Sequence, residues 1–203
     1  RQFVTEITAA QVGLALAVAG QVAAGKILRL FLENENAVPS PSGVMLRKEA
    51  LTRVGGWESS FPAMCDDQVL YAKILLLDNN LFVAGVPLYY YRQHEASLCR
   101  TALQEDRYYE DKKRYFAWLR SYLQAGPAAW SQYLKPVNEQ ATLLEIRRQF
   151  DLRYNKGVSR LQALAIFIQV LSQLRRSKES HFSYKVLRYG CGYMFGRMLA
   201  PNR

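Results

Sequence analysis

The sequence is poor in cysteine and histidine, with 3 Cys and 2 His among 203 residues. The cysteines, Cys65, Cys99 and Cys191, are odd in number and form no C-x-x-C pair. This pattern excludes a disulfide scaffold and a zinc ribbon, and it fits a protein of a reducing compartment. The first residue is Arg1 rather than Met, and no signal peptide follows it, so we expect a chain that is entered partway along.

Acidic residues are the minority among the charges. The chain has 27 Lys and Arg against 17 Asp and Glu, a formal net charge of +10, while half of its residues are hydrophobic. Such a composition excludes intrinsic disorder and allows a sizeable core. A sequence pI near 9.6 is common in nucleic-acid-binding proteins. However, the basic residues and the aromatic run Tyr89–Tyr91 lie in different segments and no binding motif is present, so we expect no nucleic-acid partner.

The first third of the chain has few charges and no early proline. Residues 3–33 are rich in Ala, Leu and Val, which predicts helix. Residues 7–24 carry no charge, and a membrane span needs about 20 apolar residues. Gln11 and Gln21 favour a buried or interfacial helix pair instead, and both alternatives stay open.

The remaining chain divides into short mixed segments and then long helical ones. Pro39 and Pro41 predict a linker. The expected elements after it are a short buried strand at 43–47, a helix at 48–54 closed by Gly55-Gly56, a helix at 66–77, and strands at 81–84 and 88–91. Helices are expected at 103–124, 128–134, 138–154, 158–176 and 182–199.

Two groups of side chains could carry chemistry. Asp66 and Asp67 open the predicted helix, where the helix dipole stabilises carboxylates, so they fit either a general base or simple N-capping. Arg92 and His94 alternate along the end of a predicted strand and fit a phosphate or metal-bound phosphate, or else a surface arginine and a satisfied histidine. Cys65 lacks a partner base and is expected to be a small buried residue rather than a nucleophile.

Five ordered segments carry a resemblance to a known enzyme family. They are SGVMLRKEAL at 42–51, VGGW at 54–57, Phe61-Pro62, Asp66-Asp67 and PLYYYRQHEAS at 87–97. In this order and spacing they closely resemble the acceptor half of family-2 glycosyltransferases, which are inverting enzymes of the GT-A fold. The resemblance runs from roughly Leu28 to Ser97 and does not extend to the helical remainder.

The resemblance implies a role for individual residues. Asp67 matches the catalytic base, and Asp66 takes the place of the usual Glu before it. His94 matches a position that helps bind a divalent cation in several members, and Arg92 is a candidate phosphate or structural contact. Trp57 is either part of the acceptor pocket or a core residue under the glycine turn, and the two alternatives are evenly balanced.

One part of the family pattern is missing. A complete member carries a D-x-D or similar motif that holds Mn²⁺ or Mg²⁺ and the diphosphate of a nucleotide-sugar donor, and this sequence has none. We therefore expect residues 1–102 to be the C-terminal half of a GT-A domain with α/β structure, followed by a basic helical extension at 103–203. The isolated chain is expected not to turn over, because the donor site is absent.

The basic tail suggests where such an enzyme would work. From Glu145 to Arg203 there are 12 Lys and Arg against 3 Asp and Glu, and amphipathic basic helices bind anionic membrane surfaces. The expected acceptor is a glycan or lipid-linked sugar, and the expected location is the cytoplasm, at the inner face of the cell membrane. The alternative is a non-catalytic basic helical module that binds a membrane surface or a protein partner.

Overall fold

The structure is a computed structural model that describes a defined part of the chain. The described residues are 3–4, 20–33, 38–62, 64–77, 80–83, 91–92, 96–98, 101–102, 107–155 and 168. They belong to two compact units, Arg1–Gln140 and Ala141–Arg203, which are considered separately. The sequence placed a domain boundary after residue 102 instead, and that division stays a prediction.

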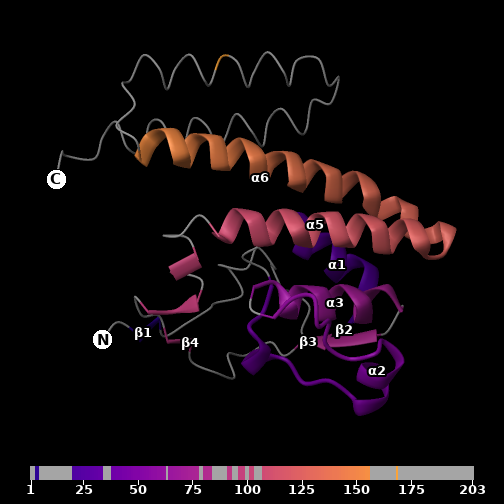
Figure 1. The fold of residues 1–203 in the computed structure, drawn as a ribbon. Coiled ribbons are helices and arrows are strands. Elements are labelled where there is room, and N and C mark those ends of the chain that lie inside the picture. Colours follow the sequence, from indigo (N-terminus) through magenta and orange to yellow (C-terminus); the bar gives the residue numbers. More distant parts are fainter. Residues whose placement is uncertain are drawn as a thin grey trace. The chain divides into compact units, whose positions relative to one another are not determined.

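Among the residues that the structure describes in the first unit, four short strands form two antiparallel pairs (Figure 1). β1 (Phe3–Val4) pairs with β4 (Tyr91–Arg92), and β2 (Gly20–Ala23) pairs with β3 (Asn80–Val83). The prediction of helix throughout 3–33 is therefore wrong at both β1 and β2. Along β2 the buried Val22 alternates with the exposed Gln21 and Ala23, and the strand forms because it pairs with residues almost sixty positions away.

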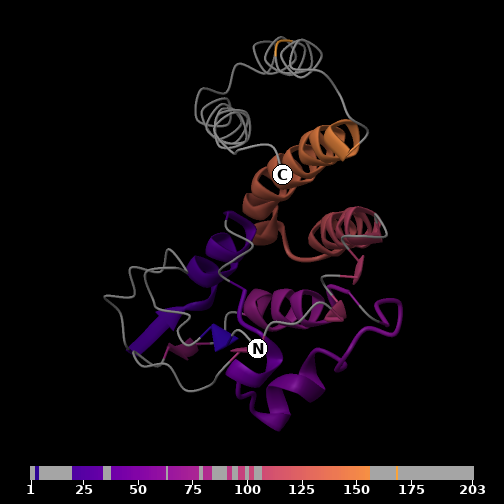
Figure 2. The same cartoon turned by 90° about the vertical axis from the view of Figure 1, so that its left-hand side faces the viewer.

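Helices build the core of the first unit, and Figure 2 shows them beside one another. α1 (Ala24–Glu33) buries Ala24, Ile27, Leu28 and Leu32 at helical spacing. α3 (Asp66–Leu76) is buried from Val69 to Leu76 and contacts both α1 and α5 (Arg107–Ala125). The predicted helix at 66–77 is confirmed, and its central position in the core fixes the residues at its N-terminus.

The segment before α3 differs in one respect from the sequence prediction. A 3₁₀ turn, η2, covers Pro41–Gly43, and residues 44–47 are in no strand. Met45 is 98% exposed, so the prediction of a buried strand at 43–47 is wrong. Residues 44–47 have no strand partner within the described part of the chain, and an extended segment without a partner is not a strand.

The helix after this segment is confirmed. α2 covers Lys48–Arg53, and Gly55 and Gly56 follow it with φ of +74° and +70°. The Gly56 N–H donates to the Leu51 carbonyl at 3.0 Å. This is the left-handed helix ending that glycine adopts without a Cβ penalty, and it turns the chain towards Trp57.

Long helices dominate the later described residues. α5 is followed by the 3₁₀ helix η3 (Ala128–Tyr133) and by α6 (Leu134–Asn155), close to three of the predicted helices. α6 begins earlier than predicted, at Leu134. Pro136 lies in the first turn of the helix, where a backbone N–H has no partner within the helix, so the proline interrupts no hydrogen bond. The helices predicted at 158–176 and 182–199 lie outside the described residues, apart from Ile168. Among the described helices, none is both long and apolar enough to cross a membrane.

Candidate functional site

The acid pair occupies the first turn of α3. Cys65 precedes it in the left-handed region, with φ of 66°, and its carbonyl accepts the Val69 N–H at 2.9 Å. Cys65 is buried, as the sequence predicted. A non-glycine residue in this conformation costs about 1–2 kcal/mol, so the surrounding packing must hold the turn that presents Asp66 and Asp67.

A hydrogen bond, burial and nearby charges all act on the Asp67 carboxylate. Its Oδ1 accepts the backbone N–H of Gln68 at 2.7 Å. Burial raises the pKa of Asp67 above its ordinary value, and the neighbouring Asp66 charge raises it further, while the Gln68 N–H and the Lys112 ammonium lower it. A carboxylate with a raised pKa at a helix N-terminus is suited to accept a proton.

Two α5 side chains that the sequence reasoning missed face the acid pair. Lys112 is only 4% exposed, and its Nζ donates to the Gln68 side-chain oxygen at 3.0 Å. Tyr115 is buried, and the loss of solvent, together with Cys65 and Asp67, raises the pKa of its phenol far above the usual value. The phenol therefore stays protonated. No local pattern predicts that either side chain lies beside Asp67, because both residues are more than forty positions from it in the sequence.

A small cavity lies beside this group. Its polar lining comes from Gln68, Lys112 and Gln140, and its apolar lining comes from Leu28, Phe31, Leu32, Val38, Ala72, Tyr115 and Phe116. Its volume of about 20 Å³ is enough for one water molecule. The cavity is too small for a sugar.

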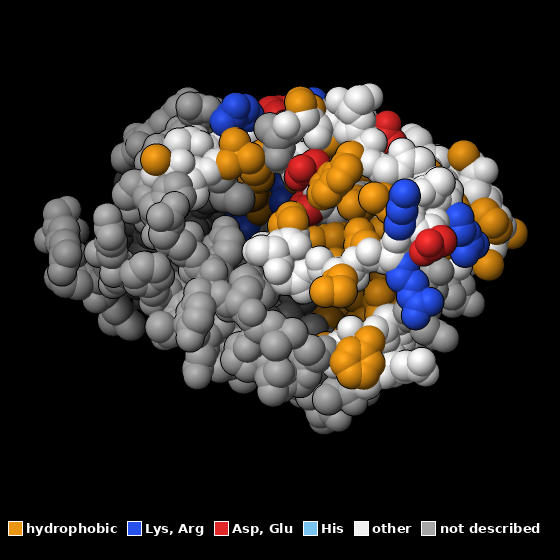
Figure 3. All heavy atoms as spheres, turned by 90° about the horizontal axis from the view of Figure 1, so that it is seen from below, with side chains coloured by type: hydrophobic (Ala, Val, Ile, Leu, Met, Phe, Trp, Pro, Cys, Tyr) orange, Lys and Arg blue, Asp and Glu red, His pale blue; other side chains and the backbone are white. Residues whose placement is uncertain are grey.

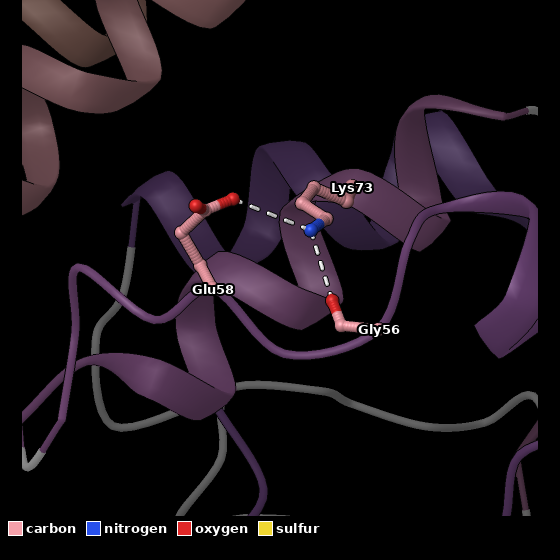
Figure 4. Close-up of polar contacts among 3 residues, drawn as sticks. All are labelled: Gly56, Glu58 and Lys73. Atoms are coloured by element: carbon pink, nitrogen blue, oxygen red, sulfur yellow. Dashed lines mark hydrogen bonds and ion pairs between the residues drawn. The ribbon is translucent and has the colours of Figure 1, made fainter.

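The loop after α2 is tied to α3 by a buried lysine. Lys73 Nζ donates to the Gly56 carbonyl at 2.9 Å and lies 3.5 Å from Glu58 Oε2 (Figure 4). Trp57, between these two partners, is 51% exposed. The alternative of Trp57 as a core residue is therefore wrong, and its place in an acceptor pocket stays a prediction.

A row of stacked aromatic rings follows α5 into η3 next to this loop. Successive ring centroids lie 6.5 Å apart for Tyr115 and Trp118, 5.0 Å for Trp118 and Tyr122, and 5.5 Å for Tyr122 and Trp130. Phe61 of the loop meets Trp118 edge-on at 6.0 Å. Burial, with a smaller effect of Glu58, raises the pKa of Tyr122. The spacing of residues 115, 118 and 122 at three and four positions is the signal that could have identified this row from sequence.

The structure does not test the two other predicted site residues. Arg92 belongs to β4, where it is paired with Phe3, and its side chain is not described. His94 lies outside the described residues. Among the residues that the structure describes, no three His, Cys, Asp or Glu side chains are grouped so as to hold a metal ion.

The surface of the described residues includes an apolar area. Figure 3 shows hydrophobic side chains gathered on one face, with basic and acidic side chains beside them. Among the described residues of the first unit, the large exposed hydrophobic ones are Met45, Trp57, Phe82 and Leu98.

Comparison with known proteins identifies no relative: no family model, no curated protein and no solved structure matches this chain.

Proposed function

We propose that this chain is the acceptor-side portion of an inverting glycosyltransferase of the hexosyltransferase type. The complete enzyme transfers a sugar from a nucleotide-sugar donor to a hydroxyl of a glycan or lipid-linked acceptor. The proposal combines the resemblance of residues 42–97 to family-2 glycosyltransferases with the arrangement of the acid pair. GT-A architecture beyond the described mixture of helices and short strands is part of this proposal.

The observation that carries the proposal is the state of Asp67. Its carboxylate is partly buried at a helix N-terminus and accepts one N–H at 2.7 Å, and its pKa is raised by burial. Simple N-capping does not describe the pair, because Cys65 is the N-cap residue and no side chain makes a capping hydrogen bond. A proton acceptor at this position is what an inverting transfer needs, since the reaction uses one base rather than the two carboxylates of a retaining hydrolase.

The proposed reaction is a single displacement. The acceptor hydroxyl oxygen forms a bond to the anomeric carbon while the bond from that carbon to the donor diphosphate breaks, and the electron pair leaves with the diphosphate. The hydroxyl proton passes to Asp67. Because Oδ1 accepts the Gln68 N–H, we assign proton transfer to Oδ2.

The divalent cation, Mn²⁺ or Mg²⁺, is proposed for the complete enzyme only. It would stabilise the departing diphosphate. The described residues do not fit a metal site, and His94 as a ligand remains a proposal from the resemblance. The role proposed for Asp67 does not depend on which residues hold the metal.

The test is Asp67→Asn in a polypeptide that carries both this chain and a donor-binding half. We expect turnover of nucleotide sugar to fall by about 10²- to 10⁴-fold, the usual contribution of a general base, while nucleotide affinity is retained. Glu33→Gln, which changes an exposed carboxylate at the end of α1 and outside the five segments, is the matched control and should keep normal turnover. Normal turnover in Asp67→Asn would refute the assignment.

A further inference from the structure

Lys112 is a buried cation that the proposed reaction does not use. It lies on α5, outside every segment that carries the resemblance, and is 4% exposed. Moving an ammonium group out of water is costly unless charges and hydrogen bonds compensate for it. The groups around Lys112 therefore indicate what the charge does there.

The contacts of Lys112 lead to the acid pair. Its Nζ donates to Gln68 Oε1 at 3.0 Å and lies 5.8 Å from the centre of the Tyr108 ring. Gln68 in turn donates its backbone N–H to Asp67 Oδ1 at 2.7 Å. The side chain of Gln68 is thus held by Lys112 and its backbone by Asp67, so one residue connects the cation of α5 to the carboxylate of α3.

We propose that Lys112 is a positioning residue that fixes, through Gln68, the helix turn on which the Asp67 carboxylate rests and supplies the positive charge next to this carboxylate. The proposal rests on the proposed function only in naming Asp67 as the base. The electrostatic relation between Lys112 and Asp67 holds whatever reaction the site performs.

The charged and titratable groups around Asp67 come from three parts of the chain. Asp66 belongs to the same helix turn, Cys65 to the turn before it, and Lys112 and Tyr115 to α5. Burial and Asp66 raise the pKa of Asp67, and the Gln68 N–H and Lys112 lower it. Lys112 is the one cation among these groups, so its removal leaves burial and Asp66 opposed by the backbone N–H groups of Gln68 and Asp67.

The first experiment measures the titration of Asp67 directly in the full chain by ¹³C NMR of the carboxyl group. In Lys112→Gln, which retains a neutral donor for Gln68 but no charge, we expect the Asp67 midpoint to shift to higher pH than in the wild type. Lys112→Arg retains the charge and should restore the wild-type midpoint. Lys113→Met removes a neighbouring exposed lysine of α5 and should leave the midpoint unchanged.

An unchanged or lower Asp67 midpoint in a folded Lys112→Gln chain would overturn the proposal. Lys112→Met offers the same comparison without a donor, so a chain that fails to fold with one substitution can be tested with the other. The readout requires no turnover. A missing glycosyltransferase activity would therefore refute the proposed function without affecting this result, and an unshifted midpoint would refute the role of Lys112 alone.

In an active complete enzyme the same substitution has a second readout. The acidic limb of the pH–rate profile should move to higher pH in Lys112→Gln and return in Lys112→Arg, because only ionised Asp67 can accept the proton. A uniform loss of rate with an unmoved limb would show a structural role only and would contradict the proposal.

Discussion

At the scale of single residues, the site holds a carboxyl group, Asp67, in surroundings that disfavour its charge. Asp67 has a raised pKa because it is partly buried next to Asp66, and Lys112 is buried on the facing helix. Groups placed in this way cost folding stability and supply reactivity, a trade-off that is common at functional sites. Their stability effects can be measured without knowledge of the substrate.

The first prediction concerns the pH dependence of stability. The folded chain binds the Asp67 proton more tightly than the unfolded chain, so the free energy of unfolding decreases as pH rises from the ordinary value of 3.8 through the folded pKa. Asp67→Asn removes this cost and keeps an acceptor for the Gln68 N–H. We expect it to melt at a higher temperature than the wild type at pH 7.

The control for this effect is pH itself. Below the ordinary aspartate pKa, Asp67 is protonated in both states, so the difference in melting temperature between wild type and Asp67→Asn should disappear. Calorimetry across this pH range would measure it. A lower melting temperature for Asp67→Asn at pH 7 would show that the ionised form stabilises the fold.

At the scale of elements, a few long-range contacts hold the loops to the helices. Lys73 of α3 contacts the loop at Gly56 and Glu58. The ring of Phe61, in the same loop, packs against Trp118, and its centroid lies 5.0 Å from the Arg114 guanidinium carbon. These contacts hold the loop that carries Trp57 against α3 and α5. Their loss should loosen the loop before it unfolds the helices.

Lys73→Met tests the first of these contacts. Lys73 is 5% exposed, and its removal leaves the Gly56 carbonyl without this donor and Glu58 without this cation. We expect the free energy of unfolding in urea to fall by about 1–3 kcal/mol. Lys48→Met, at an exposed lysine of α2, should change it by less than about 0.5 kcal/mol. Equal values for the two variants would refute a role for Lys73.

Gly126→Ala tests the end of the aromatic row. A Cβ at Gly126 would overlap Cε3 of Trp130, so the indole ring must move away from its stacked position on Tyr122. Crowding of this kind costs about 1–3 kcal/mol, which chemical denaturation would detect. In a Trp130→Ala background the same substitution should cost almost nothing, and an unchanged cost there would locate the strain elsewhere.

At the scale of the whole molecule, the positive charge of the C-terminal segment is the main feature that the proposed reaction does not explain. The residues from Glu145 onward carry 12 of the 27 Lys and Arg residues. The complete enzyme is proposed to act at the inner face of a membrane, where lipid-linked acceptors are found. A basic segment gains about 1 kcal/mol per Lys or Arg near an anionic surface.

The membrane prediction can be tested by sedimentation with vesicles. The full chain should bind vesicles that contain phosphatidylserine, and binding should weaken as salt rises, whereas neutral phosphatidylcholine vesicles should not bind it. Combined Arg175→Gln, Arg176→Gln and Lys178→Gln substitutions should weaken binding on the order of 10²-fold. The same number of changes at Lys48, Arg53 and Lys113 should have little effect, and equal weakening would show that net charge alone matters.

The sequence by itself determined the features that depend on near neighbours. The start of α3 at Asp66, the glycine ending of α2 and the buried Cys65 were predicted, because helix caps, left-handed glycines and apolar spacing act within a few residues. Two other features were decided only by the tertiary structure. Residues 20–23 form a strand because 80–83 pair with them, and Lys112 reaches the acid pair because α5 packs on α3. Both depend on the free energy of contacts between distant segments, which no local pattern contains.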